Sequence, residues 1–246
     1  LWIEVLRVQE FRVTFFDIGQ GDSIFVETVE GHRILIDGGP DTAVLEKLAK
    51  RIPFWDRELD LVILTHADAD HVAGLIDVLD QYKVEQILWT GVETSTVTFE
   101  AWKERMEREG AAISIAEAPQ RIVWGGDAFM EVLHPFLGYE TEVLNDTSIV
   151  IRLIHPEASI VMTGDATKAV EAELDVEADV LKLGHHGSKT STSALFVEKV
   201  KPKIAVISVG SENSYGHPHP SVLETLAEYG ISIKRTDTDG DITLRF

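Results

Sequence analysis

The most informative part of the sequence is residues 61–74, which read LVILTHADADHVAG. Its four leading apolar residues predict a buried strand, and the residues at its end predict a helix. Between these elements, two histidines and two aspartates fall within six residues. His66 stands where the strand ends and is held rigidly there, while Asp68 and Asp70, at alternate positions, can turn toward one point. Asp70 and His71 are neighbours and must point differently, so the pattern suits two metal ions better than one.

The alternative interpretation is a solvated acidic loop that caps the following helix, which we expect from Gly74 to Tyr82. Two aspartates alone would be enough for capping. That interpretation leaves the flanking histidines without a role, and we therefore favour metal ligands.

The composition fits one globular domain. The 246 residues are within the range of a single α/β domain, and 44% hydrophobic residues is typical of a protein with a real core. The sequence has no apolar run long enough to span a bilayer and no basic-plus-apolar signal segment at its start. Because the chain begins at Leu1 rather than at methionine, we expect it to be a piece of something larger.

Cysteine content and net charge limit the chemistry. Cysteine is absent, which excludes any disulfide partner and any thiolate metal site and leaves histidine and carboxylate groups as the ligands. The net charge of −20 argues against broad non-specific binding to nucleic acid, which needs a cationic face. It does not exclude a phosphate-containing substrate held by metal ions, because bound cations dominate the field near them.

The order of predicted elements indicates one domain of the α/β class over residues 1–246. Strand-like runs precede helix-like segments in both halves of the chain, and no linker or low-complexity segment divides it. Two mixed β-sheets packed face to face, with helices outside, fit this order. Residues 1–10 are expected to form a lead-in strand or a linker.

Four further predicted strands are followed by polar groups with small residues beside them. These groups are Asp37, Asp165, the pair His185 and His186, and His217. Strand ends hold catalytic groups rigidly, and a neighbouring glycine lets a substrate approach closely.

The HADADH motif (66–71) looks like the metal motif of the metallo-β-lactamase fold superfamily, with Asp68 in place of the usual second histidine. Together with the motifs given below, it resembles the C-terminal metallo-hydrolase domain of the ComEC/Rec2 competence family, the DNA-uptake channel of bacteria. The resemblance runs from about Phe11 to the C-terminus. The further motifs occur in order as FDIGQGD (16–22), LIDGG (35–39), NDTS (145–148), TGDA (163–166), LKLGHHGS (181–188) and YGHP (215–218).

The resemblance implies an αβ/βα four-layer sandwich of the metallo-β-lactamase type, with a two-metal site at one edge. It assigns His66 and Asp68 to one metal. It assigns Asp70 and His71 to the other metal, and Asp165 would bridge the two.

One histidine of the pair His185 and His186 would complete the second site. Because adjacent strand residues face opposite ways, we do not expect both to bind the same ion. We expect His185 to be the ligand and His186 to face the substrate.

Many members of the superfamily supply a further histidine ligand between the opening motif and the bridging aspartate. The candidates here are His134 and His155, which are each followed by proline and are expected to lie in turns. Asn145 or Asp146 occupies the equivalent stretch and is the alternative, reaching the first metal directly or through water.

The carboxylates of Asp68, Asp70 and Asp165 make the site rich in hard oxygen donors, which moves the preference from zinc toward manganese or magnesium. We expect two divalent metal ions, with Mn²⁺ favoured and Zn²⁺ or Mg²⁺ as alternatives. The three carboxylates leave roughly one net positive unit for an anionic phosphodiester. A hydroxide activated by the two metals would attack phosphorus.

Two residues, Ser188 and Lys189, precede a predicted helix, where free backbone N–H groups favour a phosphate. The alternative is ordinary capping of this helix by Ser191 or Thr192.

The candidate substrate-binding residues are Asn145, Ser188, Lys189 and His217, and the candidate catalytic residues are Asp70, His186 and His217. His217 would protonate the leaving oxygen or bind phosphate. Asp22 and Asp37 are expected to orient the ligand histidines.

These features predict a metal-dependent phosphodiesterase. The resemblance implies a nuclease that degrades the non-transported DNA strand during bacterial DNA uptake. It would be a domain of a membrane protein at the extracytoplasmic face, with DNA and the channel and OB-like parts of that protein as partners. The alternatives are a small-molecule phosphodiesterase, such as a phosphorylcholine esterase, and a non-catalytic metal-stabilised docking module of a DNA channel.

Overall fold

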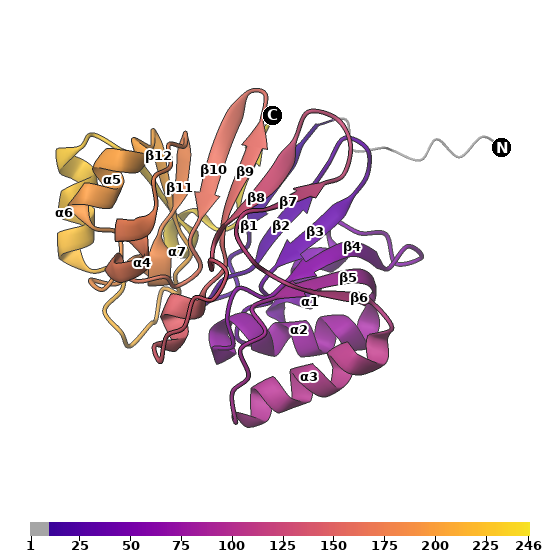
Figure 1. Ribbon diagram of the computed structural model, residues 1–246. Helices are drawn as coiled ribbons and strands as arrows, with labels where there is room; N and C mark the ends of the chain where they lie inside the picture. The colour runs from indigo at the N-terminus through magenta and orange to yellow at the C-terminus, as the bar shows by residue number, and fades with distance from the viewer. Residues whose placement is uncertain (1–9) are drawn as a thin grey trace.

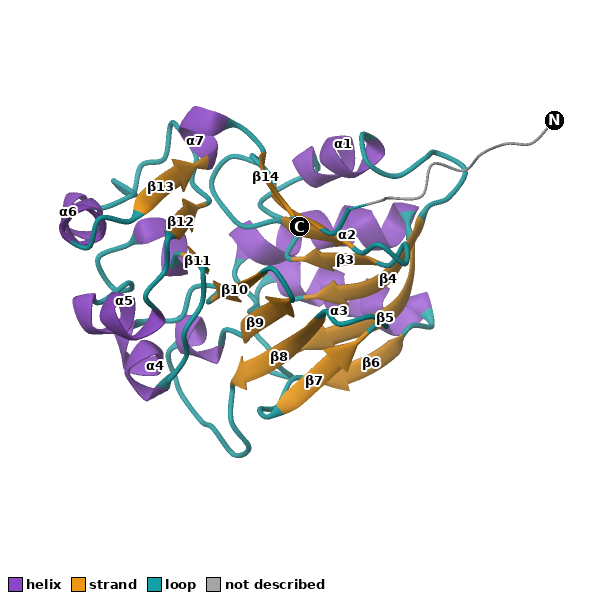
Figure 2. Cartoon of the chain, turned by 90° about the horizontal axis from the view of Figure 1, so that it is seen from above, coloured by secondary structure: helices purple, strands orange, loops and turns teal. Residues whose placement is uncertain are grey.

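Two seven-stranded β-sheets packed face to face form the centre of the structure, a computed structural model that describes residues 10–246 (Figure 1). Helices cover the outer face of each sheet (Figure 2). This arrangement confirms the predicted α/β sandwich of two mixed sheets. The lead-in strand or linker predicted before Glu10 lies outside the described residues.

The first sheet contains strands from the N-terminal half and one strand from the C-terminus. Its order is β14-β1-β2-β3-β4-β5-β6, with antiparallel pairs from β14 to β3 and parallel pairs from β3 to β6. The strands are β1 Arg12–Phe15, β2 Ile24–Glu27, β3 Arg33–Ile36, β4 Glu58–Ile63, β5 Lys83–Trp89, β6 Ala112–Ile115 and β14 Ile242–Arg245. The helices over it are α1 Ala43–Ala49, α2 Ala69–Gln81 and α3 Val97–Glu109.

The second sheet repeats this pattern in the order β13-β12-β11-β10-β9-β8-β7, antiparallel from β7 to β10 and parallel from β10 to β13. Its strands are β7 Gln120–Val123, β8 Phe129–His134, β9 Val150–His155, β10 Ala158–Met162, β11 Val180–Lys182, β12 Ile204–Ile207 and β13 Ser232–Arg235. The helical segments are η1 Leu144–Thr147, α4 Lys168–Glu173, η2 Gly184–Gly187, α5 Ala194–Val200, α6 Pro220–Glu228 and α7 Thr236–Asp239.

Three apolar clusters fill the spaces between the four layers, and strand β3 shows how. Ile34 and Ile36 point into the cluster between the sheets, whereas Leu35 points into the cluster beneath α1 to α3. Side chains alternate between the faces of a strand, so a strand buried on both faces is apolar throughout. Leu181 of β11 lies in the third cluster, beneath α4 to α6.

The carboxyl ends of β3, β4, β10 and β11 carry polar residues that the sequence places after strands. Asp37 follows β3, His66 follows β4, and Asp165 follows β10. His185 and His186 follow β11 within η2. Parallel strands within each sheet bring these ends to one edge, which is where side chains from both halves of the chain meet.

Helix α2 lies directly against the loop that follows β3. The Gly38 amide donates to His71 O at 2.7 Å, and the Gly74 amide donates to Gly39 O at 3.0 Å. A Cβ atom on Gly74 would overlap the Gly38 carbonyl oxygen and lie 2.6 Å from Asp41 O. The helix begins at Ala69 rather than at the predicted Gly74, so the second half of the HADADH motif is helical.

Substituting Gly74→Ala is expected to destabilise the protein by about 1–3 kcal/mol, because the added methyl group overpacks this contact. Helix propensity alone predicts the opposite sign, a gain of about 0.5–1 kcal/mol. Urea unfolding separates the two effects, with Ala73→Gly in the same helix as a control that measures propensity. A G74A protein more stable than wild type would contradict the close approach.

Candidate metal centre

Three histidines that are fully or almost fully buried surround the carboxylate of Asp165 at the edge described above. His71 Nε2 lies 3.3 Å from Asp165 Oδ1, and His186 Nε2 lies 3.6 Å from Asp165 Oδ2. His66 Nε2 lies 3.9 Å from Asp165 Oδ2. Asp165 comes from the second half of the chain, and two of the histidines come from the first. The centre therefore forms only when the halves pack together.

Among the described residues, four groups of ligand atoms lie close enough together to hold a metal ion, and the two groups that do not include Asp22 share His71. The atoms of His66, His71 and Asp165 lie within 4.8 Å of one another, and so do those of Asp70, His71 and His186. Asp70 Oδ2 lies 3.2 Å from His186 Nε2. Two adjoining groups that share one histidine and have a carboxylate each suit a pair of ions better than a single ion.

The chemistry of the free atoms fits a bound cation. Within the described part of the chain, Nε2 of His66, His71 and His186 and Oδ1 of Asp165 are buried and have no hydrogen-bond partner. A buried polar atom without a partner costs about 1–3 kcal/mol. Four such atoms around one point are the donor set that a divalent cation needs.

The opposite nitrogen of each ring is held in place by a hydrogen bond. His71 Nδ1 lies 2.8 Å from Asp37 Oδ2, and His186 Nδ1 lies 3.0 Å from the Ser208 carbonyl oxygen. Donation from Nδ1 to these oxygens leaves the Nε2 lone pair directed at the centre. Asp37 also accepts from the Thr65 amide at 2.8 Å, so it orients both the ring of His71 and the end of β4.

A buried ion pair lies next to the centre and was not predicted from the sequence. Lys182 Nζ, fully buried at the end of β11, contacts Asp22 Oδ2 and donates to Gly164 O at 3.3 Å. Asp22 Oδ1 is 3.6 Å from His186 Nδ1. The signal in the sequence was a lysine inside an apolar strand, in the segment LKLGHHGS (181–188).

The charges of the centre shift the ionisation of its histidines. Burial alone would lower the pKa of His71, but the carboxylates of Asp165 and Asp37 outweigh it and hold this pKa well above its usual value. Burial likewise opposes the charged form of His186, yet Asp165 and Asp22 raise its pKa to about 9.

The carboxylates shift in the opposite direction. Burial would raise the pKa of Asp165, but His186 and His71 outweigh it and hold this pKa well below its usual value. The pKa of Asp70 is lowered against its burial by its close contact with His186 and by the charge of His71. Without a metal, the site is therefore a set of imidazolium–carboxylate pairs.

The structure differs from the expectation for the pair His185 and His186. Both residues adopt left-handed backbone angles, with φ of 49° and 54°, so they are not adjacent strand residues that face opposite ways. His186 is buried and points at Asp70 and Asp165, whereas the His185 side chain is 30% exposed. His185 Nε2 lies 3.8 Å from Asp165 Oδ2, and His185 Nδ1 lies 3.1 Å from Asn145 Nδ2. Within the described residues, His186 belongs to groups of closely spaced ligand atoms and His185 does not, which favours His186 as the ligand.

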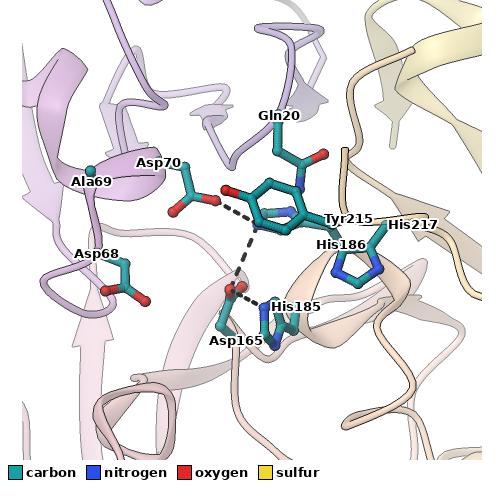
Figure 3. Close-up of a pocket in the computed structure, with 9 residues that line it drawn as sticks. All are labelled: Gln20, Asp68, Ala69, Asp70, Asp165, His185, His186, Tyr215 and His217. Atoms are coloured by element: carbon teal, nitrogen blue, oxygen red, sulfur yellow. Dashed lines mark ion pairs between the residues drawn. The ribbon is translucent and has the colours of Figure 1, made fainter. Parts of the chain in front are cut away.

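An open cavity of about 300 Å³ lies over the centre (Figure 3). The side chains of Asp68 and Asp70 are 39% and 33% exposed, so both reach from the centre toward this cavity. Within the part of the chain that the structure describes, its lining contains no lysine or arginine. The lining residues are Gln20, Asp68, Ala69, Asp70, Asp165, His185, His186, Tyr215 and His217.

The predicted phosphate-binding residues, Ser188 and Lys189, do not line this cavity. Ser188 is buried, and its Oγ accepts from the Thr190 amide at 3.3 Å. Lys189 is exposed. Helix α5 begins at Ala194 and is capped by Ser193 rather than by Ser191 or Thr192, and none of its residues lines the cavity.

The other candidates between the two motifs have structural contacts. His134 is buried, with Nδ1 3.0 Å from Ser148 O, and burial lowers its pKa. His155 packs against Phe11 with 5.0 Å between ring centroids. Asp146 accepts from the Thr167 amide at 3.1 Å. Among the described residues, none of these three belongs to a group of ligand atoms.

The comparisons with known proteins agree with the fold and the centre. Residues 16–211 match the family model of the metallo-beta-lactamase superfamily, and the chain belongs to this superfamily of metal-dependent hydrolases. It is 34% identical over 268 residues to ComE operon protein 3 of Bacillus subtilis (strain 168), covering 100% of this chain and 34% of that protein. It is 33% identical over 246 residues to the competence protein ComA of Neisseria gonorrhoeae, covering 96% and 32%. The predicted resemblance to the competence family is confirmed.

This chain spans about a third of the length of these curated relatives. Two solved structures show the same fold at low identity. YhfI of Bacillus subtilis, a metallo-beta-lactamase fold protein, has a TM-score of 0.65 at 14% identity, covering 96% of this chain and 100% of YhfI. Zn²⁺-bound PqqB of Methylobacterium extorquens has a TM-score of 0.59 at 12% identity, covering 92% and 87%. From residue 10 onward, this chain forms no helix long and apolar enough to cross a membrane.

The stability of the metal-free protein is expected to fall between pH 6.5 and 9. The pKa of His186 rises from 6.5 to about 9 on folding, so its contribution is complete below pH 6.5 and is lost as the pH rises through 9. The lowered pKa values of Asp70 and Asp165 contribute above pH 3.8 and are lost as the pH falls through their folded values. Maximal stability is therefore expected between pH 3.8 and 6.5.

Urea unfolding of chelator-treated protein across this pH range measures the effect. Metal affinity should strengthen over the same interval, because the metal needs neutral imidazoles. In the metal-free variant His186→Gln, the loss of folding stability between pH 6.5 and 9 should become smaller. A metal-free wild type that gains stability between pH 6.5 and 9 would rule out the raised histidine pKa.

Replacing Lys182 by Met is expected to cost about 3–5 kcal/mol, because it leaves the buried Asp22 carboxylate without its partner. The matched control is Lys203→Met, which removes an exposed pair with Asp179 and should change little. Urea unfolding of both variants gives the comparison. Equal stability of the two variants would show that the buried pair is not needed.

Proposed function

We propose that this chain is a metal-dependent phosphodiesterase that cleaves DNA with two divalent metal ions. The observation that carries the proposal is the convergence of four unpartnered buried atoms, from His66, His71, His186 and Asp165, beneath an open cavity. The similarity to a competence protein supports DNA as the substrate.

The proposed ligand set divides these side chains, together with Asp68 and Asp70, between two ions. His66 and Asp68 would hold one ion, with Asp68 Oδ2 3.5 Å from His66 Nε2. Asp70, His71 and His186 would hold the other ion, and Asp165, which lies near all three histidines, would bridge them. His186 takes the place that we expected for His185.

Mn²⁺ is the favoured metal, with Zn²⁺ or Mg²⁺ as alternatives. Asp68, Asp70 and Asp165 supply hard oxygen donors, and such donors favour manganese or magnesium over zinc. When bound, two divalent ions supply activated water and stabilise the charge that develops on a phosphodiester. No lysine or arginine lines the cavity within residues 10–246, so the ions would be the main source of positive charge for the substrate.

The residues over the centre would orient the phosphodiester. Burial lowers the pKa of His185 and of His217, and both rings therefore stay neutral at neutral pH. The two rings meet edge to face, with 5.6 Å between their centroids, on the side of the cavity opposite Asp68 and Asp70 (Figure 3). His217 would bind phosphate or the leaving oxygen through a neutral ring nitrogen.

The wider setting is also a proposal, since the relatives are longer than this chain. The domain would act on the strand that is not transported during DNA uptake. It would work at the extracytoplasmic face of the membrane, beside the channel and OB-like parts of a parent membrane protein.

Cleavage of single- and double-stranded DNA is expected in Mn²⁺, and it should disappear with chelator and in the variant Asp70→Ala. A gel assay with end-labelled oligonucleotides tests this. Equal cleavage by wild type and D70A would contradict the proposal. Hydrolysis of a simple phosphodiester without cleavage of DNA would favour the small-molecule esterase. Tight metal binding without any turnover would favour the docking module.

Variants of the neighbouring residues His185 and His186 form a matched pair that tests the proposed metal ligands. His186→Ala should lose about one metal ion per chain and lower cleavage about 100-fold or more, because it removes a ligand. His185→Ala should keep its metal and lose activity through substrate binding alone. Metal content by mass spectrometry, together with kcat and KM, distinguishes them. Retention of both metals by H186A and loss by H185A would restore the assignment made from the sequence.

A further inference from the structure

Tyr215 is an exposed aromatic side chain at the rim of the cavity that the proposed reaction leaves without a role. Its side chain is 71% exposed, although it lines the cavity over the metal centre. Its ring lies beside that of His217 (Figure 3). The two rings are nearly parallel, with 5.8 Å between centroids and 17° between planes.

The loop that carries Tyr215 is tied down on both sides. Asn213 Nδ2 donates to Gly210 O and to His217 O, both at 2.8 Å, and Asn213 Oδ1 accepts from the His217 amide at 3.0 Å. The Gly210 amide donates to Gln20 Oε1 at 3.2 Å. The side chain of one asparagine thus closes the loop around Tyr215, which gives the exposed ring a defined position.

The loop is also joined to the metal-facing segment. The His219 amide donates to Gly187 O at 2.9 Å, and Gly187 follows His186. A Cβ atom on Gly187 would lie 2.8 Å from Pro218 Cβ, so the two segments are in close contact. The position of Tyr215 relative to the centre is therefore set by packing on both flanks of its loop.

The chemistry of this ring suits a planar ligand. Within residues 10–246, the Tyr215 hydroxyl makes no hydrogen bond, and one face of the ring is covered by His217 while the side chain stays mostly exposed. An exposed tyrosine is by itself ordinary. This one stands on a closed loop at the rim of a polar cavity, where a flat apolar surface has no structural purpose.

The electrostatics favour stacking over phosphate contacts. A protein with a net charge of −20 and a cavity without lysine or arginine within the described chain cannot gain affinity from a cationic groove. Stacking of a base on an aromatic side chain contributes without charge and tolerates any sequence. In a duplex the faces of the bases are covered by their neighbours, so such a platform selects an unpaired nucleotide.

We infer that Tyr215 is a stacking platform for an unpaired nucleobase next to the scissile phosphate, and that it directs the site toward single-stranded DNA. This inference rests on the proposed phosphodiesterase function. The His217 ring beneath Tyr215 and the His185 ring beyond it would continue the path from the base toward the metal centre.

The test is a set of single-stranded oligonucleotides with one abasic residue moved stepwise along the chain, cleaved in Mn²⁺ by wild type and Tyr215 variants. Y215A should lower kcat/KM about 10- to 100-fold through KM, whereas Y215F and Y215W should retain activity because they keep the ring. Tyr229→Ala, an exposed tyrosine at the end of α6, is the matched control and should match wild type.

For wild type, kcat/KM should fall by a similar factor when the abasic residue occupies one position beside the cleaved bond. For Y215A, kcat/KM should not fall further with the same abasic substrate, because the variant has no ring on which the missing base would stack. Wild type should also prefer single strands over blunt duplex, and Y215A should narrow that preference. The abasic scan of wild type needs no variant, so the inference remains testable if Y215A does not fold.

Failure of the inference and failure of the proposed function give different results. If wild type cleaves DNA but neither the abasic residue nor Y215A changes the rate, the stacking role of Tyr215 is wrong and the proposed nuclease function is kept. Equal impairment of Y215A and Y215F would assign the effect to the hydroxyl and overturn stacking. If wild type does not cleave, anisotropy of labelled oligonucleotides in Mn²⁺ is measured instead. Base-dependent binding through Tyr215 would then uphold the platform alone, and no binding would overturn both.

Discussion

The structure depends on one constraint: four buried polar atoms of three histidines and Asp165 have no partner in the described chain. Each such atom costs about 1–3 kcal/mol, which is large beside a total stability of about 5–15 kcal/mol for a domain. A cation at this point removes the cost. Without a cation, bound protons take its place, as the raised pKa values of His71 and His186 indicate. Folding and metal binding are therefore coupled through the same side chains.

Charge is distributed unevenly around this centre. The chain is strongly acidic, yet the fully buried amino group of Lys182 lies beneath the centre and pairs with Asp22. Lys182 helps to keep Asp22 ionised, since its charge, together with His186 and His71, outweighs burial and holds the Asp22 pKa below its usual value. The cavity above contains carboxylates and two neutral imidazoles. An anionic substrate would thus meet a surface that depends on bound metal for its attraction.

Much of the centre was predictable from short motifs, and the errors have a common cause. His66, Asp70 and His71 of the HADADH motif lie in groups of closely spaced ligand atoms, and Asp37 contacts His71. A strand through His185 and His186 predicts that the two rings face opposite ways, but left-handed backbone angles bury His186 at the centre and leave His185 partly exposed beside it. Similarly, a helix start was expected after Ser188, but α5 begins at Ala194. Both errors concern backbone geometry in short connections, which composition does not specify.

The sequence by itself determined the two mixed sheets, the polar strand ends and the types of donor group, histidine and carboxylate, because periodicity and residue chemistry are local properties. Only the tertiary structure decided which atoms converge. The first half supplies His66 and His71, the second half supplies Asp165 and His186, and the interval between them is too long for any local pattern to specify. The placement of Tyr215 over the cavity is of the same kind, because hydrogen bonds of Asn213 and packing against Gly187 position its loop.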